Sequence, residues 1–452
     1  MYDDDTIVAI ATASGVGAIS IIRLSGKDAL AIASKITKKE NFTPRLATLT
    51  KLYDVKSELI DESLVIYFQN PYSFTGQDIV EFQCHGGIAL TNMILQATLA
   101  YGARLATPGE FSKRAYLNGK IDLSQAEAIS KLIESKSEDG VKLLARQLKG
   151  ELKEFVEEIR KDLLFILAYV EVSIDYAEED LPKDILEQIN TKLNNIEQKL
   201  LTTLEISKRR EGMIDGFKVA IIGKPNVGKS SLLNKLLNFE RAIVSSIAGT
   251  TRDTIEENIK VGTHIIKIVD TAGIRDASDE IEKIGIEKSK QAIEEADIVI
   301  ALFDNSNFFD GEDNKINELL NASTKEKIVA LNKCDLENNF DRTKLEKIDL
   351  ELTISKSLAE SSLKTLIDKL QQILDNNGTV SDGMTLISKH QVISVEDTLK
   401  NILQSKSILI NGELEFFAHH ITQALENISQ ITRPYENDQM LDVMFGEFCL
   451  GK

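Results

Sequence analysis

The chain has 452 residues, of which 42% are hydrophobic and 27% are charged, a composition typical of soluble globular proteins with room for about three domains. It has no run of roughly 18 apolar residues, as a membrane-spanning helix requires, and its acidic N-terminus is unlike the basic start of a secretory signal. The net charge of −18 argues against a protein that grips nucleic acid unaided, because phosphate neutralisation requires a basic excess. A nucleic-acid substrate would then have to be held mainly by a partner or a local patch. The three cysteines lie too far apart for a disulfide framework, and we expect a cytoplasmic protein.

The first segment, residues 1–118, mixes strands and helices. Runs of β-branched and aromatic residues predict strands, and apolar residues at helical spacing predict helices. We expect strands over residues 6–12, 18–24, 63–68 and 78–85, and helices over residues 27–37 and 88–101. Because this order is not a βαβ repeat, we predict an α+β domain.

Long helices are predicted on both sides of the middle of the chain. Apolar residues recur three and four positions apart in three stripes, and such stripes ordinarily form the core of a helical bundle. The stripes are Leu148, Leu152, Phe155, Ile159, Leu163, Ile166 and Val170, then Ile185, Ile189, Leu193, Ile196, Leu200 and Leu204, and finally Leu414, Phe417, Ile421, Leu425, Ile428 and Ile431. Helix starts are expected at Thr107-Pro108-Gly109-Glu110 and at Ser124, where Glu127 would complete a capping box.

Between these helices, short apolar strands alternate with helices, as in a parallel α/β sheet. The strands are expected over residues 218–222, 265–269, 298–303 and 328–331. The segment ends near the turn-rich Asn376-Asn377-Gly378. We therefore predict an α/β domain over residues 216–378, inserted into one helical domain that comprises residues 119–212 and 379–452.

A phosphate-binding loop follows the first strand of this α/β segment. Residues 223–230 read Gly-Lys-Pro-Asn-Val-Gly-Lys-Ser and match G-x-x-x-x-G-K-[ST] between a predicted strand and a predicted helix. Glycines in such a loop let backbone N–H groups surround phosphate oxygens at a helix N-terminus. Lys229 would neutralise the β- and γ-phosphates, and Ser230 would bind Mg²⁺. The other residues expected at the nucleotide in this region are Asn226, Val227, Gly228 and Ser231.

Three further motifs follow in the order expected of a GTPase. Gly249-Thr250-Thr251 lies where a loop would bring Thr251 to the magnesium ion, and Asp270-Thr271-Ala272-Gly273 ends a strand beside that ion. Asn332-Lys333-Cys334-Asp335 ends the strand over 328–331. The carboxylate of Asp335 can accept both N1–H and N2–H of guanine, a pattern that adenine does not present. Together the motifs predict a Ras-like P-loop GTPase domain specific for GTP.

Hydrolysis needs a positioned water, and the residue that usually orients it is missing. In Ras-like GTPases a glutamine after Asp-x-x-Gly performs this task, but Ile274 stands at that position. Another group must therefore orient the water, or a second element must complete the catalytic site.

Taken together, these motifs and the rest of the chain resemble the MnmE (TrmE) family of tRNA-modification GTPases from end to end. Outside the GTPase motifs, the resemblance is carried by residues 5–9, 22–26, 72–76, 81–87, 108–112, 117–123 and 125–128, and by the terminal Phe448-Cys449-Leu450-Gly451-Lys452. A C-terminal Cys-x-Gly-Lys after such a domain is highly specific to that family. The phosphate-binding loop alone would not have identified it.

The resemblance implies that GTP hydrolysis needs potassium and pairing of the GTPase domains. Asn226, with Ser245, Ile247 and Thr250 of the following loop, would hold K⁺ where an arginine finger would otherwise place positive charge. Glu282 would orient the water indirectly, although by itself it is indistinguishable from an exposed helix carboxylate. The catalytic residues would then be Lys229, Thr251, Glu282 and, for tRNA modification, Cys449.

The family also implies a homodimer whose N-terminal domain binds a tetrahydrofolate one-carbon donor, in its 5,10-methylene or 5-formyl form. The residues that match its folate site are Arg23, Glu81, Lys120 and the terminal Lys452. Period-2 alternation puts Glu81 on a polar strand face with Gln83 and His85, which suits a pterin ring and water equally. Arg23 lies on the same strand face as Ile19 and Ile21. A charged residue is unusual on such an apolar face and would be explained by an anionic ligand. The two lysines cannot be told from solvated lysines without the family.

With the flavoprotein MnmG (GidA), which carries FAD, the family modifies carbon 5 of the wobble uridine (position 34) of certain tRNAs. The implied assembly is a heterotetramer in which the partner mainly holds the tRNA. Cys449 alone would be read as a small hydrophobe, but three residues from the chain end we expect it to be exposed. The resemblance suggests that it takes part in the modification.

Some positions depart from the family pattern. Ala13-Ser14 replaces prolines, and Ser355-Lys356 stands where the last guanine motif usually reads Ser-Ala. We still expect Ser355 at the guanine, with nucleotide affinity weakened by Lys356. An alternative function is a regulatory GTPase switch in ribosome assembly, but such factors usually append a basic RNA-binding module, which this acidic chain lacks. A scaffold that binds GTP without turnover is disfavoured by the intact Lys229, Ser230, Thr251 and Asp270.

Overall fold

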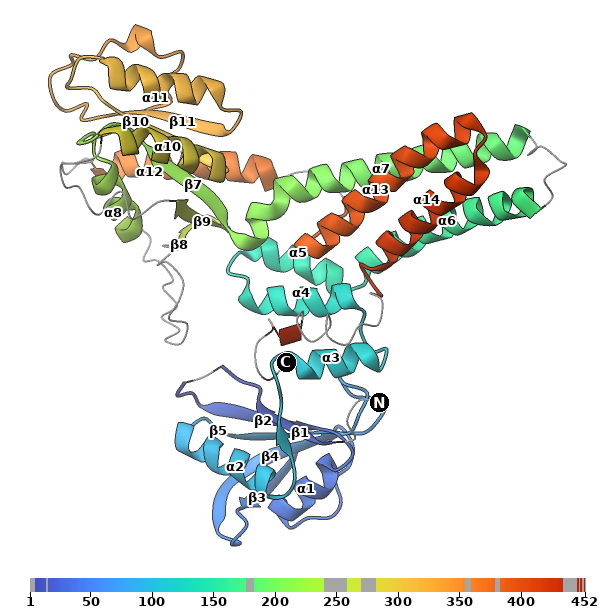
Figure 1. Ribbon diagram of the computed structural model, residues 1–452. Helices are drawn as coiled ribbons and strands as arrows, with labels where there is room; N and C mark the ends of the chain where they lie inside the picture. The colour runs from blue at the N-terminus through green and yellow to red at the C-terminus, as the bar shows by residue number, and fades with distance from the viewer. Residues whose placement is uncertain are drawn as a thin grey trace. The chain divides into compact units, whose positions relative to one another are not determined.

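The computed structural model describes residues 5–13, 15–175, 183–239, 258–269, 282–353, 359–378, 383–433, 445–446, 448 and 451. The chain divides into two compact units. The first unit is built from residues 1–130, 147–190 and 393–452, and the second from residues 131–146 and 191–392. Each contains one six-stranded sheet (Figure 1).

The sheet of the first unit is mainly antiparallel, with strand order β3-β4-β5-β2-β1-β6. Only the pairing of β1 with β6 is parallel. The strands are β1 (Ile7–Ile10), β2 (Ile19–Ser25), β3 (Thr48–Tyr53), β4 (Leu59–Phe68), β5 (Ile79–His85) and β6 (Arg104–Leu105). The register of β2 against β5 places Arg23 opposite Glu81, and this pairing brings two predicted folate ligands together.

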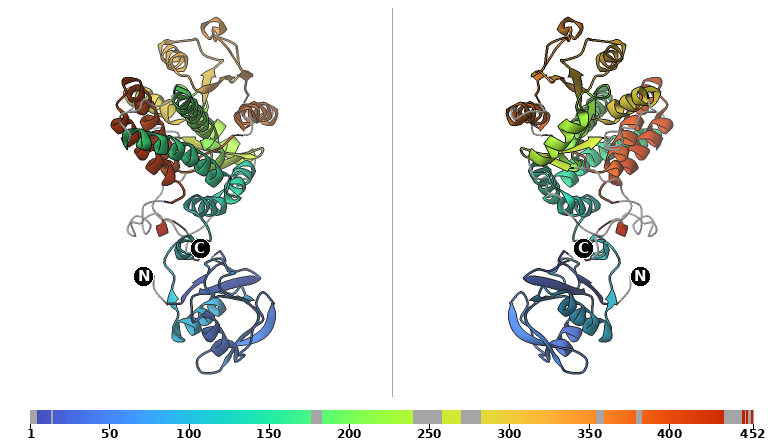
Figure 2. Two further views of the ribbon diagram at one scale, coloured as in Figure 1. Left: turned by 90° about the vertical axis from the view of Figure 1, so that its right-hand side faces the viewer. Right: turned by 90° about the vertical axis from the view of Figure 1, so that its left-hand side faces the viewer.

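Two helices, α1 (Ala29–Thr37) and α2 (Ile88–Ala100), cover one face of this sheet and form its core (Figures 1 and 2). Along β5 the residues Val80, Phe82 and Cys84 are buried in that core, whereas Glu81 and Gln83 are half-buried and His85 is exposed. The predicted alternation is therefore confirmed, because side chains of successive strand residues point to opposite faces. A third helix, α3 (Glu110–Leu117), packs Phe111 against β1.

The helical part of the first unit includes α4 (Leu123–Glu134), α6 (Glu151–Asp175), α13 (Lys389–Asn411) and α14 (Leu414–Ser429). Helices α6 and α14 lie side by side (Figures 1 and 2), and Nη1 of Arg160 donates a hydrogen bond of 2.9 Å to Oγ of Ser429 between them. The stripe from Leu414 is confirmed in part: Phe417, Ile421 and Ile428 lie on the buried face of α14, whereas Leu414 and Leu425 are only half-buried. Helix α13 was not anticipated from the sequence.

Three expectations about these helices are wrong. Leu148 ends α5 (Glu138–Leu148) and is separated from α6 by Gly150 at φ 93, because a left-handed glycine ends a helix. On α6 the buried residue is Val156, and Phe155 is only half-buried. The cap of α4 is Asp122, not Ser124: Oδ1 of Asp122 accepts from the amide of Gln125, whose Oε1 accepts from the amide of Asp122.

The sheet of the second unit has strand order β12-β11-β10-β7-β9-β8. It is parallel apart from β8, which runs antiparallel to β9. The strands are β7 (Phe217–Ile222), β8 (Asn258–Val261), β9 (His264–Val269), β10 (Ile298–Asp304), β11 (Glu326–Asn332) and β12 (Leu350–Glu351). The sequence predicted the four central parallel strands but not the short edge strands β8 and β12.

Apolar side chains alternate between the two faces of this sheet and form two cores. Helices α8 (Lys229–Phe239) and α12 (Ala359–Gly378) cover one face, and α10 (Glu282–Glu295) and α11 (Gly311–Ala322) cover the other (Figure 1). The long helix α7 (Lys183–Asp215) precedes β7. This arrangement places the ends of β7, β10 and β11 along one edge of the sheet, where the nucleotide motifs begin.

The predicted fold class is therefore confirmed: a mixed α/β N-terminal domain, a helical domain interrupted in sequence, and an inserted parallel α/β domain. The residue limits predicted for these domains stay predictions. None of the helices in the described ranges is long and apolar enough to cross a membrane.

Candidate functional site

The phosphate-binding loop joins β7 to α8, and two of its glycines are required by geometry. Gly223 has φ 152 and Gly228 has φ 105, values that L side chains rarely adopt. A Cβ on Gly223 would lie 2.4 Å from the carbonyl oxygen of Leu302, and a Cβ on Gly228 would lie 2.4 Å from Nδ2 of Asn332. The loop can therefore approach β10 and β11 this closely only because both positions lack a side chain.

Lys229 folds back over this loop. Its Nζ donates hydrogen bonds to the carbonyl oxygens of Gly223, at 2.7 Å, and Lys224, at 2.9 Å. Burial lowers the pKa of Lys229, because the charged form is poorly solvated there. A phosphate beside Nζ would offset that penalty. Ser230 and Ser231 are exposed on the first turn of α8, where the helix dipole favours an anion.

The guanine motif at the end of β11 is bonded directly to the phosphate-binding loop. Nδ2 of Asn332 donates to the carbonyl oxygen of Val227 at 2.8 Å, across 105 residues of sequence. Both residues are buried. The structure thus brings together two motifs that the sequence had only placed at separate strand ends, and Asp335 follows half-buried in the same turn.

Asp304, at the end of β10, supports this turn and was not singled out from the sequence. Its Oδ2 accepts from Nζ of Lys333 at 2.6 Å, and its Oδ1 accepts from the amide and the hydroxyl of Ser306. Burial alone would raise the pKa of Asp304, but these bonds hold it below its usual value. The sequence did offer a signal for it. Asp304 is an acidic residue at the carboxyl end of β10, the strand that lies between β7 and β11 in the sheet.

Several predicted nucleotide residues lie outside the described part of the chain. Glu282 is the first residue of α10, but its side chain is not among those described. The residues outside the described ranges are Ser245, Ile247, Thr250, Thr251, Asp270, Thr271, Ala272, Gly273 and Ser355. Their predicted roles stay predictions.

In the first unit, Arg23 and Glu81 form an ion pair on the sheet face opposite α1 and α2. Nε of Arg23 donates to Oε1 of Glu81 at 2.8 Å, and the side chains are 26% and 13% exposed. The guanidinium of Arg23 also lies 5.8 Å from the ring centre of Phe111, within the range of a cation–π contact. The two predicted folate ligands therefore form one half-buried, accessible group.

Lys120, the third predicted folate ligand, lies over a nearby turn. A Cβ on Gly76, which has φ 78, would come within 2.9 Å of Cε of Lys120. The turn is fixed by Nδ2 of Asn118, which donates to the carbonyl oxygen of Thr75 at 2.7 Å. The side chain of Lys120 is exposed, so its ammonium group can reach a ligand at this surface.

The C-terminal segment returns to the N-terminal domain. Phe445 is buried with Leu123 and Ala126, and a Cβ on Gly109 would lie 2.3 Å from the carbonyl oxygen of Phe445. Gly451, at φ 91, packs against β1 so closely that a Cβ there would lie 2.4 Å from the carbonyl oxygen of Ile10. Cys449 and Lys452 lie outside the described residues but adjoin these anchored positions in sequence.

An ionic network, buried at Glu110 and Arg114 but more exposed at Asp5 and Arg104, fixes α3 beneath this segment. Nη2 of Arg114 donates to Oδ1 of Asp5 at 2.7 Å and to Oε1 of Glu110 at 2.9 Å. Nη2 of Arg104 donates to the same Oε1 at 2.7 Å. Burial alone would raise the pKa of Glu110, but its bonds to Arg104, Thr107 and Arg114 hold that pKa below its usual value. Sequence patterns gave no signal for this network, since its members lie up to 109 positions apart.

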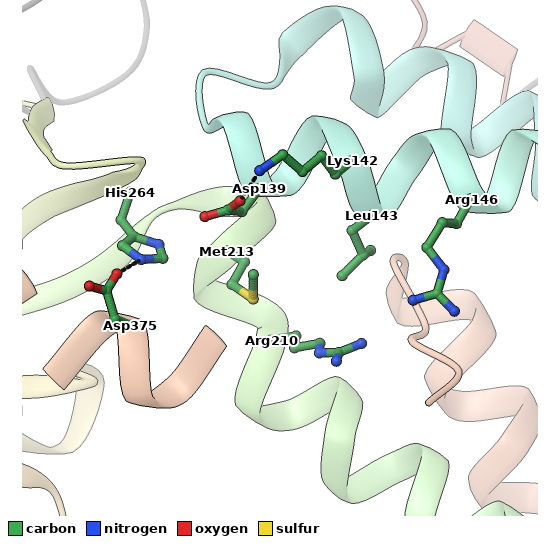
Figure 3. Close-up of a pocket in the computed structure, with 8 residues that line it drawn as sticks. All are labelled: Asp139, Lys142, Leu143, Arg146, Arg210, Met213, His264 and Asp375. Atoms are coloured by element: carbon green, nitrogen blue, oxygen red, sulfur yellow. Dashed lines mark hydrogen bonds and ion pairs between the residues drawn. The ribbon is translucent and has the colours of Figure 1, made fainter. Parts of the chain in front are cut away.

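A cavity of about 490 Å³ lies in the second unit, where α5, α7, β9 and α12 meet (Figure 3). No predicted nucleotide or folate residue lines it. Nζ of Lys142 pairs with Oδ1 of Asp139 at 2.8 Å, and Nε2 of His264 bonds to Oδ1 of Asp375 at 3.0 Å. The first bond lies within α5 and the second joins β9 to α12, whereas Oγ1 of Thr263, which donates to Oδ2 of Asp139 at 2.6 Å, links α5 to the turn before β9. We interpret the cavity as a structural junction.

Comparison with known proteins gives two matching family models. The model described as GTP-binding protein TrmE N-terminus matches residues 6–120, and the model described as MnmE helical domain matches residues 123–449. The chain is 68% identical to the tRNA modification GTPase MnmE of Aliarcobacter butzleri over 100% of both chains. It is 59% identical to that of Sulfurimonas denitrificans, over 99% of this chain and 100% of the relative. The corresponding protein of Campylobacter jejuni is 49% identical with the same coverage.

Among solved structures, the crystal structure of Era in complex with MgGDPNP and nucleotides 1506-1542 of 16S ribosomal RNA is 25% identical. The match covers 41% of this chain and 66% of the Era chain, with a TM-score of 0.26. That score is too low to support a structural assignment.

Proposed function

The chain belongs to the MnmE family of tRNA modification GTPases, and on that premise we propose a specific reaction for it. It is a potassium-dependent GTPase that, with the flavoprotein MnmG, uses a tetrahydrofolate one-carbon unit to modify carbon 5 of the wobble uridine of certain tRNAs. GTP hydrolysis and tRNA modification are the activities of the family. The full-length match to its members leaves the alternative of a ribosome-assembly switch without support.

The bond between Asn332 and Val227 is the observation that best supports the nucleotide half of this proposal. It holds the guanine motif against the phosphate-binding loop, so one nucleotide can contact both. Lys229 would bind the β- and γ-phosphates, Ser230 and Thr251 would bind Mg²⁺, and Asp335 would select guanine. The remaining proposed contacts are Asn226, Val227, Gly228, Ser231, Ser245, Thr250, Asp270, Thr271, Ala272, Gly273, Asn332, Lys333 and Ser355.

Potassium would supply the positive charge that an arginine finger supplies elsewhere. Its proposed ligands are Asn226, Ser245, Ile247 and Thr250. The support among the described residues is Asn226, which is exposed at the apex of the loop and has a left-handed backbone with φ 64. Such a conformation is costly for a residue other than glycine and recurs at functional sites. Glu282 would orient the attacking water in place of the missing glutamine.

The folate half of the proposal rests on the Arg23–Glu81 pair and its surroundings. A carboxylate such as Glu81 can accept the adjacent N–H donors of a pterin edge, and a guanidinium can bind a carboxylate tail. The pair is half-buried on a polar sheet face, which fits a ligand that is partly aromatic and partly charged. Lys120 and Lys452 would complete the site. Folate would supply the one-carbon unit, and Cys449 would take part in the modification.

We further propose a cytoplasmic homodimer that joins MnmG and its FAD in a heterotetramer. Apolar side chains on the N-terminal sheet support a dimer through that domain, because Ile19 and Leu49 are each 63% exposed and Leu64, which pairs with Leu49, is 39% exposed. Exposed apolar groups of this kind mark interaction sites. The net charge of −18 supports a tRNA held mainly by the partner protein.

Two measurements test this proposal. Turnover of GTP by the purified chain is compared in KCl and NaCl at equal ionic strength, and we expect much slower turnover in NaCl. Wobble-uridine modification is measured by nucleoside mass spectrometry in cells that lack the native gene and carry this one, and we expect it to be restored. Equal rates in both salts would contradict the potassium site, and unmodified uridine would contradict the proposed reaction.

A further inference from the structure

Lys224, the second residue of the phosphate-binding loop, is bonded to the N-terminal end of α11, a helix on the face of the sheet opposite α8. Its Nζ donates to Oδ2 of Asp310 at 2.8 Å and to Oδ2 of Asp313 at 2.7 Å. The Lys224 side chain is only 10% exposed and that of Asp313 only 1%. Burial alone would lower the pKa of Lys224, but the two carboxylates hold it above its usual value, so the lysine stays charged at neutral pH.

The two carboxylates are themselves fixed. Oδ1 of Asp310 accepts from the amides of Glu312 and Asp313, and Oδ2 of Asp313 accepts from the amide of Asp310. These bonds form the capping box of α11, which satisfies the free amides of its first turn. The partner of Lys224 is therefore a rigid helix end.

Residues 225 and 226 lie between two such anchors. On one side, the side chain of Lys224 is bonded to α11. On the other side, the carbonyl of Val227 is bonded to Asn332. Pro225 further restricts the backbone between them. The left-handed backbone of Asn226, at φ 64, is uncommon for a residue with a side chain, although asparagine tolerates it better than most residues, and the anchors on both sides hold it in place.

We infer that Lys224 is a positioning residue for the cation site of the proposed potassium-dependent reaction. Its ion pair with Asp310 and Asp313 holds the loop apex so that Asn226 is presented to the cation before nucleotide binds. The inference rests on the proposed function, since it assigns a role within that site. A preformed loop lowers the ordering cost of binding.

Lys224 could act on the cation site by positioning the loop or only through its charge. The two explanations predict opposite changes in cation affinity when the lysine is removed. Lys224 with Asp310 and Asp313 carries a net charge of −1, from one ammonium and two carboxylates. Removing the ammonium leaves two carboxylates near the loop, and their field would strengthen cation binding. Loss of positioning would weaken cation binding instead.

The test is potassium activation of GTP hydrolysis by the full chain, titrated at constant ionic strength with choline chloride. For Lys224→Met we expect the half-activating K⁺ concentration to rise about tenfold, the size of one charge-assisted hydrogen bond. The maximal rate at saturating K⁺ should stay within about twofold. Affinity for a fluorescent GDP analogue in Na⁺ should change by less than about threefold, because Lys229 and the loop glycines are intact.

Three further variants complete the design. Lys224→Arg should restore the normal K⁺ response, because a guanidinium can also bridge two carboxylates. Lys315→Met, at an exposed position of the same helix, is the matched control and should behave as the parent. Lys224→Gln, which removes the charge but keeps a polar side chain, should raise the half-activating concentration by a similar factor and provides a second readout if Lys224→Met does not fold.

A half-activating K⁺ concentration that falls or stays unchanged in Lys224→Met would overturn the inference, as would failure of Lys224→Arg to restore the response. These outcomes are distinct from failure of the proposed function. In that case the parent chain itself would hydrolyse GTP equally fast in K⁺ and in Na⁺.

Discussion

The nucleotide site and the N-terminal site are built in different ways. The phosphate-binding loop is contiguous in sequence, and its glycines, Lys229 and the start of α8 lie within eight residues. The proposed folate site would instead combine β2, β5 and the turn at Gly76 with the C-terminal segment, which lies at the other end of the chain in sequence. A contiguous site is recognisable from its motif, whereas an assembled site depends on strand register and long-range packing. The difference also predicts that each site can be damaged without damaging the other.

The largest expected effect is on nucleotide specificity. Asp335→Asn should weaken GTP affinity by about 3–4 kcal/mol, or roughly 100- to 1000-fold, because an amide cannot accept both guanine donors and a buried donor is left unpaired. The same variant should gain affinity for xanthosine triphosphate, whose C2 carbonyl accepts from the amide. Equilibrium titration with both nucleotides measures this. Unchanged GTP affinity would show that the guanine motif is misplaced, and folate binding serves as the internal control.

A smaller effect is expected from the ionic network of α3. Glu110→Gln should lower the free energy of opening of α3 by about 2–3 kcal/mol, because Arg114 would lose its buried carboxylate partner. Hydrogen exchange of peptides from residues 110–117 measures it in the full chain, with Glu62→Gln at an exposed strand position as the control. GTP hydrolysis should be unchanged.

The same network predicts a pH dependence. Bonds to Arg104, Thr107 and Arg114 hold the pKa of Glu110 below its usual 4.5, so the ionised carboxylate stabilises the folded state. That stabilisation is complete above pH 4.5 and is lost as the pH falls through the lowered pKa. Protection of α3 should therefore decrease in acid in the parent and change less in Glu110→Gln. Parallel pH curves for the two would contradict the assignment.

The smallest of these effects concerns the Arg23–Glu81 pair. Arg23→Gln should weaken tetrahydrofolate binding about tenfold, since it removes one charge-assisted contact from a half-buried site. Calorimetric titration of the full chain with a stable folate analogue measures this. The potassium-stimulated GTPase rate should remain that of the parent. If folate affinity were unaffected, the pair would be structural.

Sequence patterns identified the central strands of both sheets, the phosphate-binding loop and the guanine motif, because alternation and loop chemistry are local. They missed β3, β6, β8 and β12, which are the edge strands of the two sheets and carry no long apolar run. They also misplaced the start of α4, since Asp122 and Ser124 are both good caps and only the backbone decides between them. Asp304 and the Asp5–Arg114 contact could not be predicted, because each bond depends on residues that only the folded chain brings together.

The central claim is that one chain carries a GTPase site and a separate modification site that includes the C-terminal segment. Gly451 tests this directly, because a Cβ there would meet the carbonyl oxygen of Ile10 at 2.4 Å. Gly412 has a similar backbone, with φ 76, but a Cβ there would meet nothing within 4 Å. Gly412→Ala therefore controls for backbone strain alone.

The deciding measurement is wobble-uridine modification in cells carrying Gly451→Ala, Gly412→Ala or a deletion of residues 448–452, beside the GTPase rate of each purified variant. We expect Gly451→Ala to lower modification at least about tenfold and the deletion to abolish it, with potassium-stimulated GTP hydrolysis within about twofold of the parent. Gly412→Ala should modify tRNA normally. Normal modification by the deleted chain, or GTP hydrolysis that collapses together with modification, would contradict the account.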